Sequence, residues 1–261
     1  MLDLDVRYFR GHDGAKLAYR EVGEGRPVIL IHGFLASSEH WLRFGHAAAL
    51  SALGYRVVMP DVRAHGDSDR SHDASDYPPD ILAEDGFALV EQLGFGVRDY
   101  DLGGYSLGAR TTIRMLARGA TPGRAIVAGM GLEGIVHTAG RGGQFRHLLT
   151  NLGTFEFGSP DWKAEAYLRK IGADPVALLL ALGTTVDTSP EALAAIEPPT
   201  LIVVGAEDER HSSAEALAAT LAHGRYVAVP GDHESAIRTA EFTAAITDFL
   251  GVAAPGASIA R

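Results

Sequence analysis

The chain has 261 residues, of which 46% are hydrophobic and 21% are charged, a composition typical of a globular protein with a sizeable core. Its formal net charge of −10 argues against a nucleic-acid partner, because phosphates bind to basic patches and the sequence has none. The absence of cysteine excludes disulfides, thiolate catalysis and cysteine-based metal sites. We see no signal peptide and no apolar run near the roughly 18 residues of a membrane helix, so we expect a cytoplasmic protein with no membrane partner.

Strands and helices alternate along the first half of the chain. Two partly alternating runs predict an opening hairpin, and the continuous apolar runs after it predict strands buried on both faces. The predicted strands are residues 5–10, 16–23, 26–33, 55–61 and 97–106. The predicted helices are residues 37–54, 79–94 and 107–119. Ser38 is a possible N-cap of the first helix, and Gly54 is its C-terminal stop.

The second half continues the alternation after one interruption. Strands are predicted at 124–130, 198–208 and 225–231, and helices at 213–224 and 239–252. Between them, residues 134–196 contain helical and glycine-rich pieces but no clear buried strand, and this segment is too long for an ordinary loop. We interpret it as a small helical cap inserted into a core of residues 1–133 and 197–261. Within that core, residues 253–261 form a small, polar tail that is expected to fray.

A candidate nucleophile lies where a predicted strand meets a helix. Residues 104–108 read Gly-Tyr-Ser-Leu-Gly, which is the pattern G-x-S-x-G around Ser106. A tight strand-to-helix turn can hold the serine in a strained backbone conformation, and glycine at 104 and 108 relieves the crowding around it. The turn also directs backbone N–H groups at the helix N-terminus toward the space above the serine, which suits an oxyanion.

A serine hydroxyl needs a base, and the base needs a carboxylate to orient it. His233 follows the last predicted strand in the sequence Gly-Asp-His-Glu, and Asp208 follows the preceding strand within an acidic run. In a parallel sheet these loops share the edge that carries Ser106. Asp208, His233 and Ser106 therefore form a candidate catalytic triad.

An oxyanion hole needs two hydrogen-bond donors. The N–H of Leu107, directly after the serine, is one candidate. The N–H of Phe34, in the loop after the strand at 26–33, is the other, and Gly33 lets the backbone approach closely there.

Together these segments resemble the α/β-hydrolase superfamily over nearly the whole chain. The matching motifs are Ile-Leu-Ile-His-Gly-Phe, the elbow Gly-Tyr-Ser-Leu-Gly-Ala, Leu-Ile-Val-Val-Gly-Ala-Glu-Asp-Glu and Pro-Gly-Asp-His-Glu-Ser. The resemblance implies an α/β fold with a mostly parallel eight-stranded sheet flanked by helices, a cap inserted after the sixth strand, and no cofactor. It also implies a structural role for His32 and gives Glu133, after the sixth strand, as an alternative acid. The loop that often reads D-x-R-G-H-G has Ala64 at a glycine position, so its turn is expected to differ.

The resemblance leaves several reactions open. A serine carboxylesterase that cleaves small or medium acyl esters leads, and lactonase, C–C bond hydrolase and cofactor-free perhydrolase remain alternatives. Serine at 106 argues against the superfamily's epoxide hydrolases and haloalkane dehalogenases, because these use aspartate as the nucleophile. A ligand-binding protein with an inactive triad is an alternative of a different class, since fold alone does not fix function.

Other candidate residues have plainer interpretations. His211 is expected to be a solvated loop residue, and the other histidines lack metal-ligand spacing, so no metal site is expected. Six aromatic residues could line a pocket for a small-molecule substrate, although single aromatics more often belong to a core. They are Phe34, Trp41, Phe145, Phe155, Phe157 and Trp162. The sequence does not indicate an oligomeric state.

Overall fold

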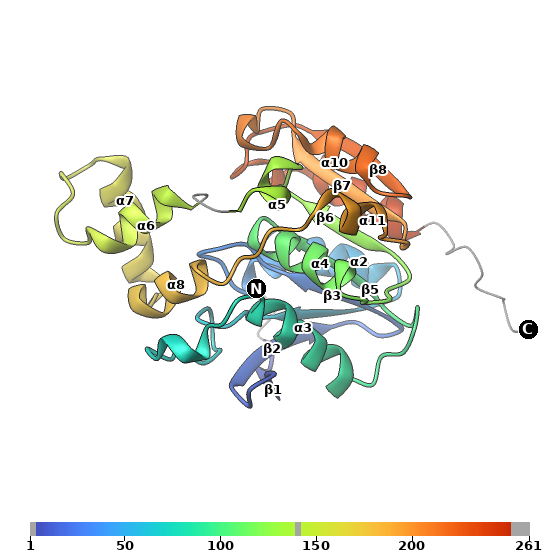
Figure 1. The fold of residues 1–261 in the computed structure, drawn as a ribbon, viewed down its shortest axis with the longest axis horizontal. Helices are drawn as coiled ribbons and strands as arrows, with labels where there is room; N and C mark the ends of the chain where they lie inside the picture. Colours follow the sequence, from blue (N-terminus) through green and yellow to red (C-terminus); the bar gives the residue numbers. More distant parts are fainter. Residues whose placement is uncertain (1–3, 139–141, 252–261) are drawn as a thin grey trace, which may run out of the picture.

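A single eight-stranded sheet forms the centre of the computed structural model, which describes residues 4–138 and 142–251 (Figure 1). The strand order is β1-β2-β4-β3-β5-β6-β7-β8. The strands are β1 (Arg7–Arg10), β2 (Lys16–Val22), β3 (Arg26–Ile31), β4 (Tyr55–Pro60), β5 (Asp101–Tyr105), β6 (Ala125–Ala128), β7 (Thr200–Gly205) and β8 (Gly224–Val229). β2 pairs antiparallel with β1 and β4, and every other pairing is parallel. The mostly parallel sheet predicted from the sequence is therefore confirmed.

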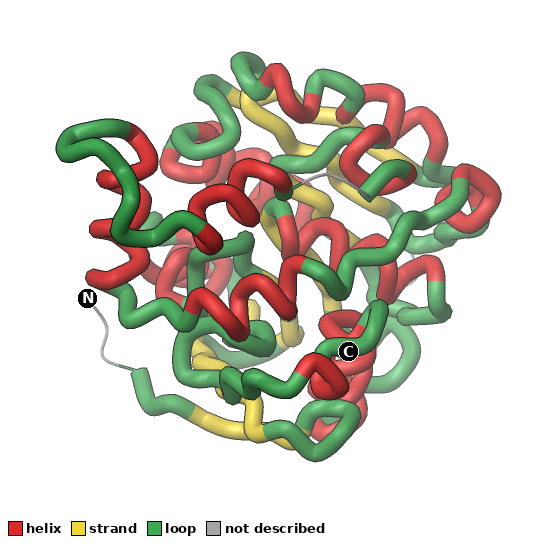
Figure 2. Tube along the Cα trace, turned by 60° about the vertical axis from the view of Figure 1, so that its left-hand side comes forward, coloured by secondary structure: helices red, strands yellow, loops and turns green. Residues whose placement is uncertain are grey.

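Helices cover both faces of the sheet (Figure 2). α1 (Glu39–Arg43), α2 (His46–Ala52) and α11 (Ala240–Gly251) pack on one face, and α3 (Ile81–Gln92), α4 (Leu107–Ala117) and α10 (Ala214–Thr220) pack on the other. Along β3, Val28 and Leu30 belong to the first core, whereas Ile29 and Ile31 belong to the second. A strand with a core on each face must be apolar at every position, which explains its continuous apolar sequence.

The predicted helix at 37–54 is two helices, so that prediction was wrong in its continuity. α1 ends at Arg43 and α2 begins at His46, and Gly45 between them has a φ of 81°, a left-handed conformation that glycine adopts without strain. Ser38 makes no side-chain cap bond. Its backbone N–H donates instead to Asp61 Oδ1 at 2.6 Å, so Ser38 ties the start of α1 to the loop after β4.

The predicted strand at 97–106 is shorter than expected. β5 begins only at Asp101, whose buried carboxylate accepts two hydrogen bonds of 2.9 Å from Arg26 and one of 3.3 Å from Arg124. Burying this carboxylate is tolerated because two guanidinium groups neutralise it. These ion pairs fix the amino ends of three neighbouring strands, β3, β5 and β6.

Between β6 and β7, the described residues form helices and connecting loops but no strand. They are α5 (Glu133–Val136), α6 (Gly143–Thr150), α7 (Pro160–Lys170), α8 (Pro175–Leu182) and α9 (Pro190–Ala194). α6, α7 and α8 form a lobe at one side of the molecule, which we call the helical lobe (Figure 1). The lobe has its own apolar cluster, including Leu148, Leu168 and Leu178, and this cluster extends to Ala64 and Tyr77 in the segment after β4. The lobe therefore rests on loops at the carboxyl edge of the sheet.

Alanine at position 64 was expected to change the turn of its loop, but it adopts a left-handed backbone of the kind that glycine favours. Its φ is 71°, in the left-handed region where alanine is strained, and the side chain is buried in the cluster of the helical lobe. The Ala64 methyl group thus adds apolar contacts to the cluster of the helical lobe, at a position where glycine would adopt the same backbone without strain.

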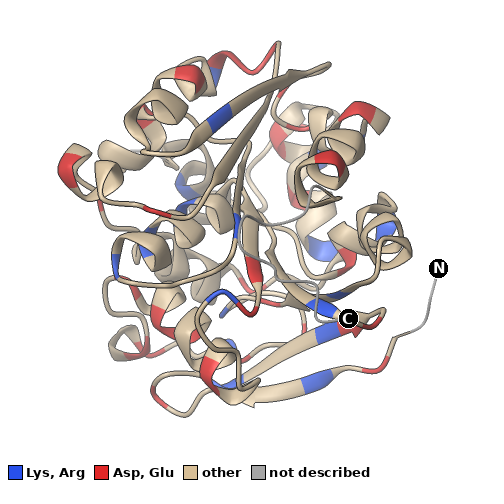
Figure 3. Ribbon diagram, turned by 90° about the vertical axis from the view of Figure 1, so that its right-hand side faces the viewer, with Lys and Arg blue, Asp and Glu red and all other residues tan. Residues whose placement is uncertain are grey.

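Lys and Arg alternate with Asp and Glu along the ribbon in Figure 3, and neither sign is confined to one part of the fold. Within residues 4–138 and 142–251, no helix has both the length and the apolar character needed to cross a bilayer. The tail at 253–261, which was expected to fray, lies outside the described residues.

Buried histidines should make the fold sensitive to acid. Burial lowers the pKa of His32, His40 and His46 to about 4. It lowers the pKa of His65 to about 3. Because these values lie below the ordinary value of 6.5, the unfolded chain binds more protons than the folded chain as the pH falls from 6.5 toward 4. Each histidine then lowers the free energy of unfolding by up to about 1.4 kcal/mol per pH unit.

We therefore expect the midpoint temperature of thermal unfolding to stay constant above about pH 6.5 and to fall steeply between about pH 6.5 and 4.5. Circular dichroism measures this temperature at each pH. His65→Gln should flatten this dependence, whereas the exposed His137→Gln should leave it unchanged. A midpoint that stays constant across this range would show that the buried histidines do not govern acid stability.

Candidate active site

Ser106 occupies a strained turn between β5 and α4. Its φ of 55° and ψ of −107° lie outside the regions that residues with a side chain ordinarily adopt. The backbone N–H of Ser106 donates to Ala128 O at 2.8 Å, so the strained residue is still hydrogen-bonded to the neighbouring strand β6. Such strain persists only where the surrounding structure enforces it, and it is concentrated at functional sites.

The two glycines of the motif allow this turn sterically. A Cβ on Gly104 would lie 2.3 Å from the backbone of Gly108, and a Cβ on Gly108 would lie 2.1 Å from Ile31 O. The first turn of α4 therefore packs directly against the end of β3, with no room for a methyl group between them. This is the crowding that the spacing of the motif predicts.

The structure brings Ser106, His233 and Asp208 into one hydrogen-bonded chain. His233 Nε2 lies 3.1 Å from Ser106 Oγ, and His233 Nδ1 lies 2.8 Å from Asp208 Oδ2. Both distances are within hydrogen-bond range, and each ring nitrogen faces the partner that a nucleophile–base–acid arrangement requires. The three residues come from the loops after β5, β7 and β8, at the carboxyl edge of the sheet.

Asp208 and Glu133 occupy very different environments. Asp208 is buried, and within the described part of the chain its Oδ1 has no hydrogen-bond partner. The Glu133 side chain is 53% exposed and its carboxylate lies 3.0 Å from His137 Nδ1, on the same short helix turn. The structure thus brings Asp208, and not Glu133, to His233.

His211 is buried beside the base, so the expectation of a solvated residue was wrong. Its ring centroid lies 4.9 Å from that of His233, and its Nδ1 accepts a long hydrogen bond of 3.3 Å from the Gly131 N–H. The only sign of this in the sequence is that His211 follows Asp208 by three residues. In the structure a short 3-10 helix, Glu209–His211, follows Asp208, and both side chains are buried.

The candidate oxyanion donors lie close to Ser106. Leu107 is the first residue of α4, so its N–H has no acceptor within the helix. A Cβ on Gly33 would lie 3.5 Å from the Ser106 Cβ, which places the loop that carries Phe34 in contact with the serine. His32 supports this loop, because its Nδ1 donates to Gly33 O at 2.7 Å and its Nε2 accepts from the Val62 N–H at 3.0 Å.

The predicted pocket aromatics separate into distinct environments. The Phe34 ring packs against that of Phe145 of α6, with ring centroids 4.8 Å apart and the rings tilted by 60°, so the helical lobe contacts the loop after β3 directly. Trp41 is 1% exposed within the core, and Phe157 is 82% exposed on the lobe, so neither position suits a pocket lining. Phe157 instead packs against Trp162 at the surface, 4.6 Å between ring centroids.

Within residues 4–138 and 142–251, one group of side chains could hold a metal ion. Asp208, His211 and His233 each bring a ligand atom to within 4.8 Å of the other two. Asp208 and His233 are already hydrogen-bonded to one another, however, so an ion would have to compete with that bond. The arrangement is explained without a metal by the chain from Asp208 to Ser106.

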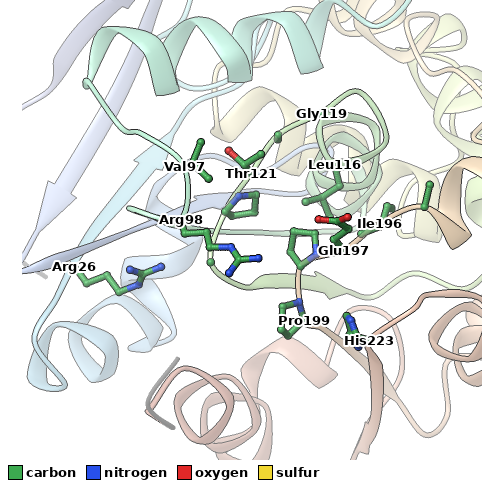
Figure 4. Close-up of a pocket in the computed structure, with 15 residues that line it drawn as sticks. Arg26, Val97, Arg98, Leu116, Gly119, Thr121, Ile196, Glu197, Pro199 and His223 are labelled. Atoms are coloured by element: carbon green, nitrogen blue, oxygen red, sulfur yellow. The ribbon is translucent and has the colours of Figure 1, made fainter. Parts of the chain in front are cut away.

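A cavity of about 720 Å³ lies at the opposite end of the sheet (Figure 4). Its lining residues precede the parallel strands and include Arg26, Arg98, Glu197 and His223. None of the three residues of the candidate triad lines it, so its size does not bear on the chemistry at Ser106.

The sequence and the fold match a known family. The sequence model of the alpha/beta hydrolase family matches residues 28–246, and the chain belongs to that family. A hydrolase from Pseudomonas aeruginosa PA01 has a similar structure, with a TM-score of 0.73 at 24% identity, over 95% of this chain and 99% of that one.

Two curated relatives have similar sequences over part of their length. A non-heme haloperoxidase of Rhodococcus erythropolis is 36% identical over 109 residues, which are 41% of this chain and 36% of the relative. Epoxide hydrolase 2 of Siraitia grosvenorii is 34% identical over 83 residues, which are 31% of this chain and 25% of the relative. The chain thus matches well under half of the length of these relatives.

The steric role of Gly108 can be tested by adding one methyl group. Gly108→Ala should lower the free energy of unfolding by about 1–3 kcal/mol or more, because the new Cβ would overlap Ile31 O. Urea denaturation measures this change. Gly143→Ala, where nothing lies within 4 Å of the added Cβ, is the matched control and should be close to neutral. Equal effects of the two substitutions would contradict the close packing of α4 on β3.

Proposed function

We propose that this protein is a serine hydrolase that cleaves carboxylic esters of small or medium acyl groups. The observation that carries the proposal is the chain of two hydrogen bonds, 3.1 Å and 2.8 Å, that links Ser106 Oγ through His233 to Asp208. A serine on a strained elbow, an imidazole and a buried carboxylate in this order form the arrangement that activates a hydroxyl for acyl transfer.

In the acylation step, Ser106 Oγ attacks the ester carbonyl carbon while His233 Nε2 takes the proton of the Ser106 hydroxyl. Asp208 remains ionised, accepts the hydrogen bond from His233 Nδ1–H and stabilises the imidazolium that forms. The N–H groups of Leu107 and Phe34 bind the oxyanion of the tetrahedral intermediate, and one such donor typically contributes about 10²–10³ in rate. The alcohol leaves with the proton held by His233.

In the deacylation step, the same residues act on water. His233 takes a proton from a water molecule, whose oxygen attacks the acyl carbon of the ester on Ser106. The tetrahedral intermediate collapses, the carboxylic acid leaves and Ser106 Oγ regains its proton from His233. Each proton taken by the histidine is returned, so the enzyme ends in its starting state and needs no cofactor.

The aromatic residues near Ser106 and the net charge of the chain support a substrate that is apolar and uncharged. Phe34 and Phe145 bring aromatic rings from the oxyanion loop and the helical lobe together. An apolar acyl or alcohol group gains from contact with such surfaces. The net charge of −10 mildly disfavours anionic substrates.

The first test is hydrolysis of p-nitrophenyl acetate, butyrate and octanoate by the wild type and by Ser106→Ala. We expect clear turnover by the wild type and a loss of at least about 10³-fold in the variant, because the nucleophile is removed. If the wild type binds these esters but neither turns them over nor reacts with a fluorophosphonate, a ligand-binding role replaces the hydrolase proposal.

The acid can be identified by two isosteric substitutions. Asp208→Asn should lower kcat by roughly 10³–10⁴-fold, since the amide no longer stabilises the required tautomer and charge of His233. Glu133→Gln, at the exposed alternative position, should change kcat by less than about twofold. Steady-state kinetics on one ester measures both values, and the reverse ranking would assign the acid to Glu133.

Perhydrolysis is a second candidate, favoured by the sequence similarity to a non-heme haloperoxidase. Hydrogen peroxide would replace water in deacylation and attack the acyl carbon, so that a peracid leaves in place of the acid. Halogenation of monochlorodimedone in acetate buffer with peroxide and bromide tests for the peracid. Ser106→Ala should abolish this activity together with ester hydrolysis, because both require the acyl-enzyme.

A further inference from the structure

The candidate base reaches the nucleophile across two intervening strands. Ser106 follows β5, whereas His233 follows β8, and β6 and β7 lie between these strands. Neighbouring strands are about 4.8 Å apart, so β5 and β8 are separated by roughly 14 Å. The loop after β8 must therefore extend back over the carboxyl ends of β7 and β6. A residue held at such a distance from its own strand needs an attachment near its target.

Two glycines leave space for this crossing. A Cβ on Gly205, at the end of β7, would lie 2.1 Å from Gly231 O in the loop that carries His233. A Cβ on Gly129, just after β6, would lie 2.7 Å from the ring of Tyr105. The loop from β8 therefore passes directly over the end of β7, and the Tyr105 side chain passes directly over the end of β6.

Tyr105 meets that loop from the opposite side. It is the last residue of β5, adjacent to Ser106, and its hydroxyl donates a hydrogen bond of 2.5 Å to His233 O. The Tyr105 ring lies 5.4 Å from the His233 ring and 5.9 Å from the Phe242 ring of α11. The residue beside the nucleophile is thus bonded to the backbone of the base.

Besides the side-chain bond of His233 Nε2 with Ser106 Oγ, the following bonds also hold the loop, and they do not reach β5. Asp232 and Ser235 bond to one another through side chain and backbone, which fixes the local shape of the turn. The Glu207 N–H donates to Gly231 O at 3.0 Å, which attaches the loop to its neighbour after β7. These bonds hold the loop near β7, whereas the bond from Tyr105 connects it to β5, the strand that carries Ser106.

We propose that Tyr105 is a positioning residue whose hydroxyl holds His233 at hydrogen-bond distance from Ser106. The proposal rests on the proposed serine hydrolase function and adds to it a residue that touches neither substrate nor reacting atoms. Because Tyr105 and Ser106 are consecutive, a bond from the tyrosine to the base sets the Nε2–Oγ distance within one rigid unit. Misplacement of a catalytic group by about 1 Å can cost up to roughly 10²-fold in rate.

The hydroxyl is suited to this role over a wide pH range. Burial raises the pKa of Tyr105, and the nearby carboxylate of Asp208 raises it further. The phenol therefore stays protonated, and remains a hydrogen-bond donor, at neutral and mildly alkaline pH.

Tyr105→Phe removes the hydroxyl and keeps the ring, so it isolates the hydrogen bond. Tyr55→Phe is the control, because the buried Tyr55 hydroxyl also donates to a backbone carbonyl, that of Leu250, at 2.8 Å. It accepts a further hydrogen bond of 2.7 Å from Arg124, and both partners lie away from Ser106. We expect Tyr105→Phe to lower kcat by about tenfold with KM changed less than twofold. Tyr55→Phe should lose at least as much thermal stability as Tyr105→Phe, because it also removes the acceptor of a buried Arg124 N–H, and it should still keep wild-type kcat.

Two further readouts separate positioning from a general loss of structure. The proton on His233 Nδ1, observed downfield in the ¹H NMR spectrum, should shift or broaden in Tyr105→Phe and not in Tyr55→Phe. Gly129→Ala, whose Cβ would overlap the Tyr105 ring, should reproduce the loss of kcat with Tyr105 intact. If kcat and this resonance are the same in Tyr105→Phe and Tyr55→Phe, Tyr105 is a core residue and the proposal is overturned.

The test does not depend on identifying the correct ester. A fluorophosphonate reacts with an activated serine whatever the natural substrate, and its rate of labelling at Ser106 should fall in Tyr105→Phe in parallel with kcat. If the wild type hydrolyses no ester, the proposed function fails, while labelling and the His233 resonance still decide the role of Tyr105. If the wild type is not labelled either, the resonance alone decides it.

Discussion

The contact between the first turn of α4 and the end of β3 is the constraint on which the site depends. Because Gly108 lies against Ile31 O, the helix starts immediately beneath the oxyanion loop, and Ser106 is held in its strained conformation between them. That single contact places the serine, the Leu107 N–H and the loop of Phe34 together. A larger residue at 108 would separate the elements that the proposed chemistry needs within a few ångströms.

The remaining members of the site come from the order of the strands. Parallel strands bring the loops after β5, β7 and β8 to one edge, so residues that are 25 and 127 positions apart in the chain become hydrogen-bonded neighbours. The edge position of β8 leaves its loop far from Ser106, and glycines at the ends of β6 and β7 let the chain cross that distance. Backbone space, as much as side-chain chemistry, therefore determines whether His233 can reach Ser106.

The sequence predicts the parts of this structure that follow from local patterns. Strands such as β3 and β7 are buried on both faces, so their sequences are unbroken apolar runs that predict strands. The close contacts of Gly104 and Gly108 follow from the spacing of the motif. It does not predict the break at Gly45, because the apolar periodicity continues through both helices. The burial of His211 and the bond from Tyr105 to His233 were also missed, since both depend on which loops meet after the strands have paired. Trp41 and Phe157 were also not placed by the sequence. An aromatic residue occurs in cores, in pockets and on surfaces, and its residue type alone does not distinguish these environments.

The helical lobe has a consequence for how this protein could acquire new substrates. It is one continuous segment with its own apolar cluster, and both of its ends return to the sheet between β6 and β7. Exchange of the lobe for that of a relative would leave Ser106, Asp208 and His233 in place on the parent scaffold. The exchange would not be neutral for chemistry, however, because Phe145 of the lobe supports the ring of Phe34, whose N–H faces the oxyanion in the proposed mechanism. A chimera with an exchanged lobe should therefore retain an aromatic residue at position 145. Without that residue, we expect a lower turnover number in addition to the change in substrate selectivity.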